Sequence, residues 1–218
     1  MVIEDTARLR VPNHPVRIVL LNGPPGAGKD LAGHALARAI PGAVPLKMAG
    51  PLKSALLALH GMSRVDPLDY EGPRKEAPDE AFFGLSFRQG CIRLSEAAIK
   101  PAFGEDFFGR VLASRIARAH ARGDGWLFVV TDSGFLTEAA PLIERFGPRA
   151  VQLIRLHREG HDFRGDSRGY LPDIAGAACV DVFNRGTRQR FGEILVSTVE
   201  TWLARLNRTG ATNGGVAA

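Results

Sequence analysis

The fold of this chain is decided by the stretch Leu21-Asn22-Gly23-Pro24-Pro25-Gly26-Ala27-Gly28-Lys29-Asp30, which joins an apolar run to a helix-forming one. Apart from Arg17, residues 16–21 are aliphatic and rich in β-branched side chains, whereas residues 31–40 suit a helix that stops at Pro41-Gly42. Glycines let backbone N–H groups turn inward, and a helix N-terminus attracts anions. A strand, a glycine-rich turn and a helix in this order predict a phosphate-binding loop.

The spacing within this loop predicts a nucleoside triphosphate site. It fits the pattern Gly-x4-Gly-Lys, in which the lysine reaches the β and γ phosphates. The position after the lysine, normally a Ser or Thr that ligates Mg²⁺, is Asp30. The alternative, a glycine-rich turn with a surface lysine, is disfavoured by the flanking strand and helix. We therefore expect ATP to be bound by Gly23, Gly26, Ala27, Gly28, Lys29 and Asp30.

Composition and length predict one cytoplasmic domain. The chain has 218 residues, 45% of them hydrophobic, which suffices for a substantial core. We expect one domain over residues 1–206 and a flexible tail at 207–218, which is rich in Gly, Ala, Thr and Asn. Because residues 1–14 lack an apolar segment and no run of eighteen apolar residues occurs, neither export nor a membrane location is expected. The net charge of +5 favours anionic ligands.

The two cysteines, Cys91 and Cys179, are too few and too isolated for a disulfide framework or a metal cage. We expect them to be buried thiols.

Strand-like and helix-like segments alternate along the chain. After the loop and its helix, strands are expected near residues 43–48, 126–131, 150–156 and 178–183. Helices are expected at 52–60, 86–100, 106–121, 137–146 with Thr137 as N-cap, and 187–206. This order predicts an α/β fold with a doubly wound parallel sheet and helices on both faces. Residues 62–85, which are polar and broken by prolines, predict a long excursion over the surface.

Two regions supply candidate catalytic residues. Asp132 follows a continuously apolar strand, which places it at the ligand edge of the sheet. Its carboxylate could hold Mg²⁺ together with Asp30, or accept a proton from an attacking hydroxyl, and the alternative role is a helix cap. Residues 157–170 are dense in Arg and Gly and predict a mobile lid. There Arg158 and Arg168 would stabilise phosphoryl charge, and the alternative is a solvated loop.

Other polar residues are weaker candidates. Arg88 lies close to the start of the helix that Ser86 caps, which makes it a better acceptor-binding candidate than Arg93. Lys100 lies at the end of the same helix, where Glu96 is an alternative local partner. The histidines at 157 and 161 have the spacing of a metal pair but lack a third ligand, so we do not expect a metal there.

With these motifs in place, the chain resembles the bacteriophage deoxynucleoside monophosphate kinases, a branch of the P-loop nucleotide kinases, over about residues 16–205. The similar segments are Gly28-Lys29-Asp30, Ala49-Gly50-Pro51-Leu52-Lys53, Ser86-x-Arg88 with the aromatic residues Phe103, Phe107 and Phe108, Asp132-Ser133-Gly134-Phe135 with Glu138, and Asn184-x-Gly186-Thr187. The resemblance implies a P-loop kinase fold that uses ATP and Mg²⁺. It also implies that the acceptor is bound by Lys53, Arg88 and Lys100.

Two departures from the family pattern bear on the acceptor. Leu31 replaces a threonine, and Gly134 replaces the arginine of the family's Asp-x-Arg motif. A monophosphate acceptor carries about two negative charges, so the missing arginine argues against it, although Arg88 or Arg168 could take its place. Related phage kinases phosphorylate the hydroxymethyl group of 5-hydroxymethyluracil in DNA. That neutral alcohol needs a base, for which Asp132 is placed, and a basic protein suits DNA.

The sequence therefore predicts an ATP-dependent phosphotransferase acting on a deoxynucleotide acceptor. The favoured acceptor is 5-hydroxymethyluracil in phage DNA, and the alternative is a free deoxynucleoside monophosphate. A regulatory or DNA-packaging module that hydrolyses nucleotides is a third hypothesis. The sequence leaves the oligomeric state open.

Overall fold

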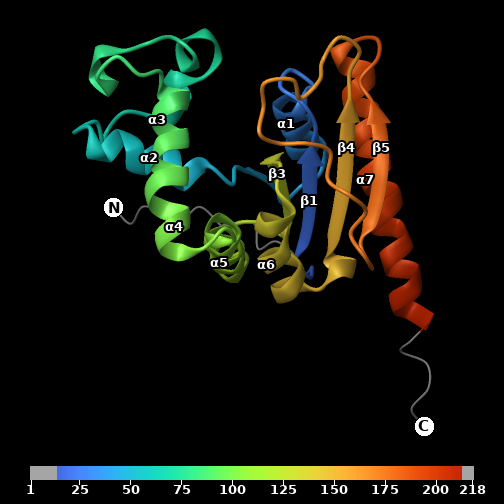
Figure 1. Ribbon diagram of the computed structural model, residues 1–218. Helices are drawn as coiled ribbons and strands as arrows, with labels where there is room; N and C mark the ends of the chain where they lie inside the picture. The colour runs from blue at the N-terminus through green and yellow to red at the C-terminus, as the bar shows by residue number, and fades with distance from the viewer. Residues whose placement is uncertain (1–13, 213–218) are drawn as a thin grey trace, which may run out of the picture.

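Five parallel strands form the centre of the computed structural model, which describes residues 14–212. They are β1 (Arg17–Asn22), β2 (Ala43–Leu46), β3 (Leu127–Ser133), β4 (Val151–His157) and β5 (Ala178–Phe183), in the spatial order β2-β3-β1-β4-β5 (Figure 1). The strands β2 and β3 lie on one side of β1 and β4 and β5 on the other, so the carboxyl edge beside β1 is a topological switch point, where open α/β sheets bind ligands.

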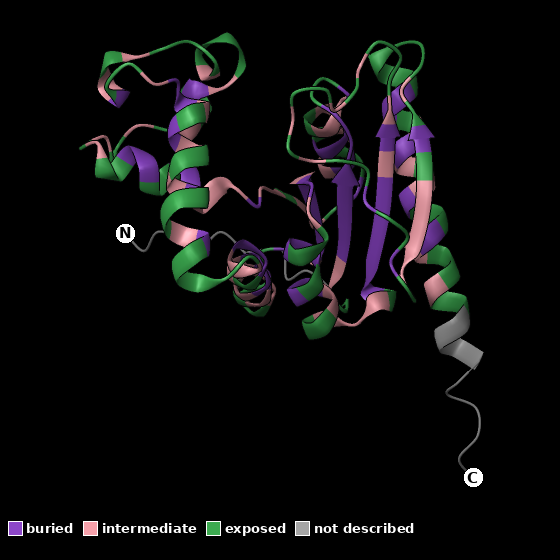
Figure 2. Cartoon of the chain, in the orientation of Figure 1, coloured by how far each residue is buried: buried purple, intermediate pink, exposed green. Residues whose placement is uncertain are grey.

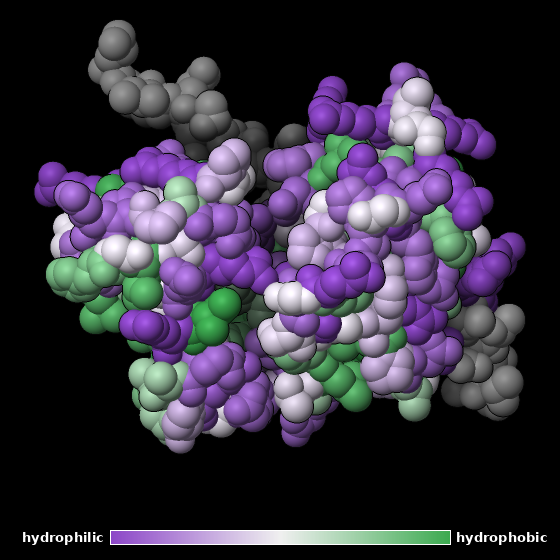
Figure 3. Space-filling view, turned by 45° about the horizontal axis from the view of Figure 1, so that its top comes forward, coloured by the Kyte–Doolittle hydropathy of each residue, from purple (hydrophilic) through white to green (hydrophobic). Residues whose placement is uncertain are grey.

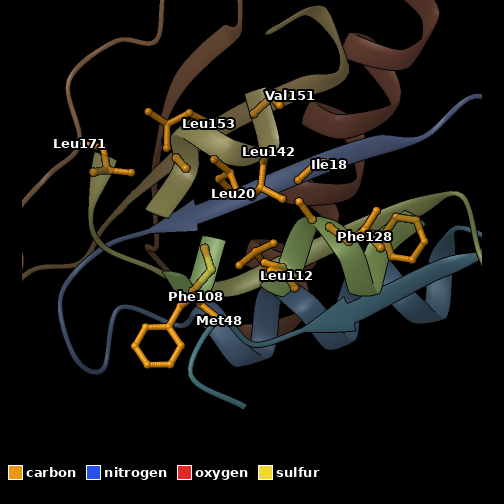
Figure 4. Packing of buried hydrophobic residues seen from close by; sticks show 14 of the residues in the cluster. Ile18, Leu20, Met48, Phe108, Leu112, Phe128, Leu142, Val151, Leu153 and Leu171 are labelled. Carbon is orange, nitrogen blue, oxygen red and sulfur yellow. The ribbon is translucent and has the colours of Figure 1, made fainter. Parts of the chain in front are cut away.

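Helices cover both faces of this sheet, as predicted. The helices α5 (Phe107–Ala121) and α6 (Leu136–Phe146) lie on one face, and α1 (Lys29–Ala39) and α7 (Arg188–Thr212) lie on the other. The alternation of side chains along β1 explains the two layers. Ile18 and Leu20 pack with Leu112 of α5 (Figure 4), whereas the intervening residues of β1 pack against α1 and α7. The strand is therefore buried on both sides.

A small lobe leaves the sheet after β2 and returns before α5. It contains the helices α2 (Gly50–Leu59), α3 (Phe87–Leu94) and α4 (Lys100–Phe103), with a π-helical segment η4 (Ser95–Ile99) between the last two. Three short 3-10 helices lie between α2 and α3: η1 (Pro67–Tyr70), η2 (Gly72–Lys75) and η3 (Glu80–Phe82). In Figure 1 this lobe stands to the left of the sheet, beyond the carboxyl ends of β2 and β3.

The predicted surface excursion at residues 62–85 folds around a small core of its own. Tyr70 and Phe82 are only 3% and 1% exposed, and they pack with Phe87 and two leucines of α2. The ring centroids of Tyr70 and Phe87 lie 4.9 Å apart. Figure 2 shows these buried positions within the lobe, separate from the buried sheet. The sequence prediction relied on the polar and proline content of this segment, and it missed the aromatic residues that pack together in the folded lobe.

Several boundaries differ from the sequence prediction. The helix α6 begins at Leu136 with Phe135 at the N-cap position, so Thr137 is inside the helix and is not its cap. Asp132 lies within β3 and not after it. The helix α7 continues to Thr212, beyond the boundary at 206 that the sequence predicted for the domain, while 213–218 are outside the described residues. A 3-10 turn, η5 (Pro148–Ala150), leads into β4. Within residues 14–212 no helix is long and apolar enough to cross a membrane.

Candidate functional site

The glycine-rich loop connects β1 to α1 in the conformation expected of a phosphate-binding loop. Gly26 and Gly28 have positive φ angles of 77° and 102°, which side-chain-bearing residues rarely adopt. The Lys29 Nζ atom donates hydrogen bonds to the carbonyl oxygens of Gly23, at 2.6 Å, and Pro24, at 2.8 Å. No side chain caps the N-terminus of α1, so its dipole points toward the loop without a competing carboxylate cap.

Burial and a neighbouring cation lower the pKa of Lys29 to about 8. Loss of hydration is the largest cause, and the guanidinium of Arg168 adds to it, while Asp30, Asp166 and Asp132 oppose it. Two cations converge here in a partly dehydrated place. Such an arrangement suits a ligand that carries several negative charges.

Asp30 faces the end of β2 and the middle of β3. Its Oδ1 accepts a hydrogen bond from the Thr131 hydroxyl at 3.1 Å and lies 3.2 Å from the Lys47 Nζ. Burial alone would raise the pKa of Asp30, but the charge and hydrogen bonds of these two partners hold it below its usual value. The side chain remains 64% exposed, so it is open to a hydrated cation.

Asp132 joins β3 to the start of the small lobe. Its Oδ1 accepts from the backbone N–H of Met48 at 2.7 Å, and its Oδ2 accepts from that of Ala49 at 3.0 Å. These two bonds hold the backbone that leads into α2, whose N-cap residue Ala49 forms no side-chain cap. At the level of sequence the alternative for Asp132 was a structural role as a helix cap. Its roles in metal binding and proton transfer stay predictions.

The loop of residues 157–170 covers the glycine-rich loop. The Arg158 Nη1 donates to the Gly26 carbonyl oxygen at 2.8 Å, and the His161 Nδ1 lies 3.0 Å from the Pro25 carbonyl oxygen. A Cβ added at Gly26 would lie 2.4 Å from the His161 ring, so the imidazole occupies the space that this glycine leaves. The two loops are therefore in direct contact, with the arginine-rich loop leaving the carboxyl end of β4 (Figure 1).

The Arg168 side chain lies against Gly134, the position at which the sequence resemblance led us to expect an arginine. A Cβ added at Gly134 would lie 2.3 Å from the Arg168 Cδ and 2.7 Å from its Cγ, so the arginine stem lies directly on this glycine. Its Nε and Nη2 donate to Asp166 at 2.9 and 2.6 Å, and the Arg88 Nη2 reaches the same carboxylate at 3.3 Å. The structure thus brings Arg88 from α3 and Arg168 from the loop together.

Glu138 is a site residue to which the sequence assigned no role. It is 8% exposed in the first turn of α6, and its pKa is raised to about 7, first by burial and then by the charge of Asp132. Lys100 and Arg168 oppose this shift. Its place in the family-like motif after Asp132 was visible in the sequence. Its burial could not be read there, because it depends on the close packing of α5 against α6 at Gly109, where a Cβ would lie 2.2 Å from the Glu138 carbonyl oxygen.

The other two predicted acceptor-binding residues sit in separate ion pairs. Lys53 is bound to Glu71, which also lies 3.6 Å from the Lys47 Nζ, and these residues line a pocket of about 370 Å³ between α2, η1 and α5. Lys100 is 7% exposed, and its Nζ lies 2.7 Å from the Glu96 Oε1 and 4.8 Å from the centroid of the Phe135 ring. Lys53 therefore lies with the pocket residues, and Lys100 on the α6 side, near Glu138.

The histidines at 157 and 161, which have the spacing of a metal pair, contact different parts of the protein. The His157 Nε2 lies 2.6 Å from the Asp181 Oδ1, whereas the His161 ring lies against the Pro25 carbonyl oxygen. Cys91 and Cys179 are partly buried free thiols. Within residues 14–212 no group of three or more His, Cys, Asp or Glu side chains is arranged to hold a metal ion.

Two solved structures are similar to this chain. One is an unliganded sugar kinase from Janibacter sp. HTCC2649, with 16% identity, a TM-score of 0.46, and coverage of 87% of this chain and 95% of that one. The other is a provisionally assigned kinase from Chloroflexus aurantiacus j-10-fl, with 12% identity, a TM-score of 0.45, and coverage of 87% and 98%. No protein-family model and no curated protein matches the chain. Likeness at this level supports no conclusion about activity, so function has to be argued from this chain's own residues.

Proposed function

We propose that the protein is an ATP-dependent phosphotransferase whose triphosphate is held by residues 23–29. The support is the loop itself: Lys29 lies beneath a backbone with two positive-φ glycines, and Arg158 and Arg168 approach from the loop above. Preorganised cations at a transferring phosphoryl group are the main means by which such enzymes accelerate transfer.

Asp30 is placed to hold Mg²⁺ beside this loop with its carboxylate. The residue is in the first turn of α1, half-open to solvent, and hydrogen-bonded to Thr131. Magnesium in such sites is bound by one or two carboxylates, by waters and by the phosphates, so a cluster of protein ligands is not required. When bound, the cation would neutralise phosphate charge, and Lys47 would have to release Asp30.

For the acceptor we propose a free deoxynucleoside monophosphate, and the observation that carries this choice is Arg168 lying on Gly134. The missing arginine was the main reason to disfavour an anionic acceptor. Arg168 and Arg88 supply two guanidinium groups, which suit phosphate because of their planar donor geometry. Figure 3 shows a hollow between the small lobe and the sheet, where an acceptor of this size would lie.

Charge in one segment of the small lobe favours a small acceptor over DNA, although residues 50–103 as a whole carry seven acidic and seven basic side chains. Residues 60–86 contain six acidic side chains against three basic ones: Asp66, Asp69, Glu71, Glu76, Asp79 and Glu80 against Arg64, Arg74 and Lys75. An acidic surface repels the phosphate backbone on which DNA affinity depends.

One observation favours the second candidate, the hydroxymethyl group of 5-hydroxymethyluracil in DNA. A neutral alcohol needs a general base with a pKa close to the working pH, and the pKa of Glu138 is raised to about 7 beside Asp132. A monophosphate oxygen is already ionised and needs no base.

The test is to incubate the protein with γ-labelled ATP and Mg²⁺ and, in separate reactions, with each deoxynucleoside monophosphate or with DNA that contains 5-hydroxymethyluracil. We expect label in a deoxynucleoside diphosphate. Label only in the DNA would select the second candidate, and label in no acceptor, with slow ATP hydrolysis, would refute both.

An arginine swap tests the observation on which the choice of acceptor rests. Arg168→Ala should lose activity, and adding Gly134→Arg to it should restore part, because the new arginine occupies the vacated space. Arg164→Ala is the matched control, since Arg164 is in the same loop and its side chain is 91% exposed. No recovery in the folded double variant would argue against a shared role for the two positions.

A further inference from the structure

Asp166 is a buried carboxylate in an otherwise exposed loop. Its side chain is 3% exposed, whereas Gly165 and Ser167 on either side are exposed. Its Oδ1 accepts hydrogen bonds from the Arg168 Nε, at 2.9 Å, and from the Arg168 backbone N–H, at 3.0 Å. Its Oδ2 accepts from the Arg168 Nη2 at 2.6 Å and from the Arg88 Nη2 at 3.3 Å. One carboxylate therefore accepts hydrogen bonds from donors on both sides of the hollow between the small lobe and the sheet.

The two arginines come from elements that are far apart in the sequence. Arg88 is in the first turn of α3 in the small lobe, and Arg168 is near the end of the loop that covers residues 23–29. Arg168 is close enough to Lys29 and Glu138 to influence the pKa of both. The Asp166 carboxylate is thus beside the place where the phosphoryl group would be transferred.

We propose that Asp166 occupies the anion subsite of the acceptor, so that an acceptor phosphate binds Arg88 and Arg168 in its place. This inference rests on the proposed phosphotransfer function. A carboxylate and a phosphate use the same guanidinium donors, but a phosphate offers more oxygens and more charge. The acceptor phosphate would displace the Asp166 carboxylate, and the two arginines would stay to hold the acceptor.

The same loop contains a pair that distinguishes this role from ordinary ion pairing. Asp162 lies 3.5 Å from Arg164, and both side chains are largely exposed. Exposed ion pairs of this kind contribute little to the stability of a protein. Removing the charge of Asp162 should leave anion binding unchanged, whereas removing that of Asp166 leaves Arg168 without its hydrogen-bonded carboxylate and Arg88 with Glu76 as its remaining partner.

The experiment measures binding of inorganic phosphate and of a deoxynucleoside monophosphate by calorimetry without ATP, in wild type, Asp166→Asn and Asp162→Asn. We expect about tenfold tighter binding of both ligands to Asp166→Asn, a coupling of ordinary size, with the control unchanged. The KM for the acceptor should fall in the same proportion, with the KM for ATP unchanged. Equal or weaker phosphate binding by Asp166→Asn would overturn the inference, since a residue that merely orders the loop gives that result.

A measurement on the wild type keeps the test independent of the variant's folding. Phosphate should speed hydrogen exchange at the Arg168 backbone N–H, because that group loses its bond to Asp166. Slower or unchanged exchange at saturating phosphate would contradict displacement. If no deoxynucleoside monophosphate acquires label but phosphate binding tightens in Asp166→Asn, the proposed function fails and the subsite stands. If label is transferred but phosphate binding does not tighten, only the subsite fails.

Discussion

Lys29 is the residue from which the triphosphate site can be tested directly. Its Nζ atom contacts only the carbonyl oxygens of its own loop, so Lys29→Ala should leave the fold intact. The loss of one charge-assisted contact to the transferring phosphoryl group should lower the rate on the order of a hundredfold or more. Initial rates with labelled ATP and circular dichroism measure the two effects. Arg38→Ala, an exposed change in the last turn of α1, is the control, and full activity in a folded Lys29→Ala protein would remove the assignment.

The lowered pKa of Lys29 also predicts a pH dependence of ATP binding. ATP should bind the protonated ammonium, so affinity should fall as the pH rises above about 8, where the free protein loses this proton. Calorimetry at pH 8.5 in buffers of different ionisation enthalpy should detect proton uptake. The uptake should be absent in Lys29→Met, and its persistence there would assign it to another group.

Glu138 should make stability depend on pH. Its pKa in the folded protein, about 7, is raised above the unfolded value, so its contribution to stability is fully present below the unfolded pKa and is lost as the pH rises through 7. Glu138→Gln should therefore be more stable than wild type at pH 8, by about 1 to 3 kcal/mol, and the difference should shrink toward pH 4.5. Urea unfolding at the two pH values measures this. A difference that does not change with pH would show that Glu138 ionises normally.

At the scale of elements, Asp132 connects β3 to the N-terminus of α2. Asp132→Ala removes the acceptor of two backbone N–H groups and should lower the free energy of unfolding by about 1 to 2 kcal/mol. Asp132→Asn keeps one acceptor oxygen and should lose less stability. Comparing the rates of the two variants with their stabilities separates this structural role from a chemical one. If the Asn variant is stable and fully active, Asp132 serves only to hold the backbone that leads into α2.

The loop at 157–170 should act as a closing element over ATP. Arg158→Ala removes its bond to the Gly26 carbonyl oxygen, so turnover should fall more than ATP affinity. Hydrogen exchange should show slower exchange of the loop amides when a non-hydrolysable ATP analogue binds to wild type, and less slowing in the variant. Exchange that is insensitive to ATP in both proteins would identify the loop as ordinary surface.

At the scale of the whole molecule, the small lobe has a core separate from that of the sheet. Phe82, 1% exposed, packs between Tyr70 and Phe87, so Phe82→Ala should cost roughly 3 to 5 kcal/mol within that lobe. We expect loss of acceptor binding with ATP binding kept, because the sheet cluster contains none of these residues. Calorimetry with each ligand measures this, and equal loss of both would show that the lobes unfold together.

The sequence by itself determined the loop, the strands and the layers. A Gly-x4-Gly-Lys spacing between an apolar run and a helix is a local pattern, and residues 18–21 of β1 and 127–130 of β3 are all apolar because both faces of these strands are covered. The capping box at Ser86 was equally local, and the structure has it. Such features depend on residues that are close together in the chain, so they can be predicted from the sequence alone.

Only the tertiary structure decided which charges meet. Arg88 and Arg168 share Asp166 across 80 residues of sequence, and the Arg168 stem fills the space above Gly134. The sequence showed a missing arginine and offered Arg88 or Arg168 as its replacement, but it could not place either side chain, because a long side chain can reach many places. The raised pKa of Glu138 likewise comes from burial between two helices. Contacts between distant segments and the loss of water around them exist only after folding, and for that reason the choice of acceptor depends on the structure.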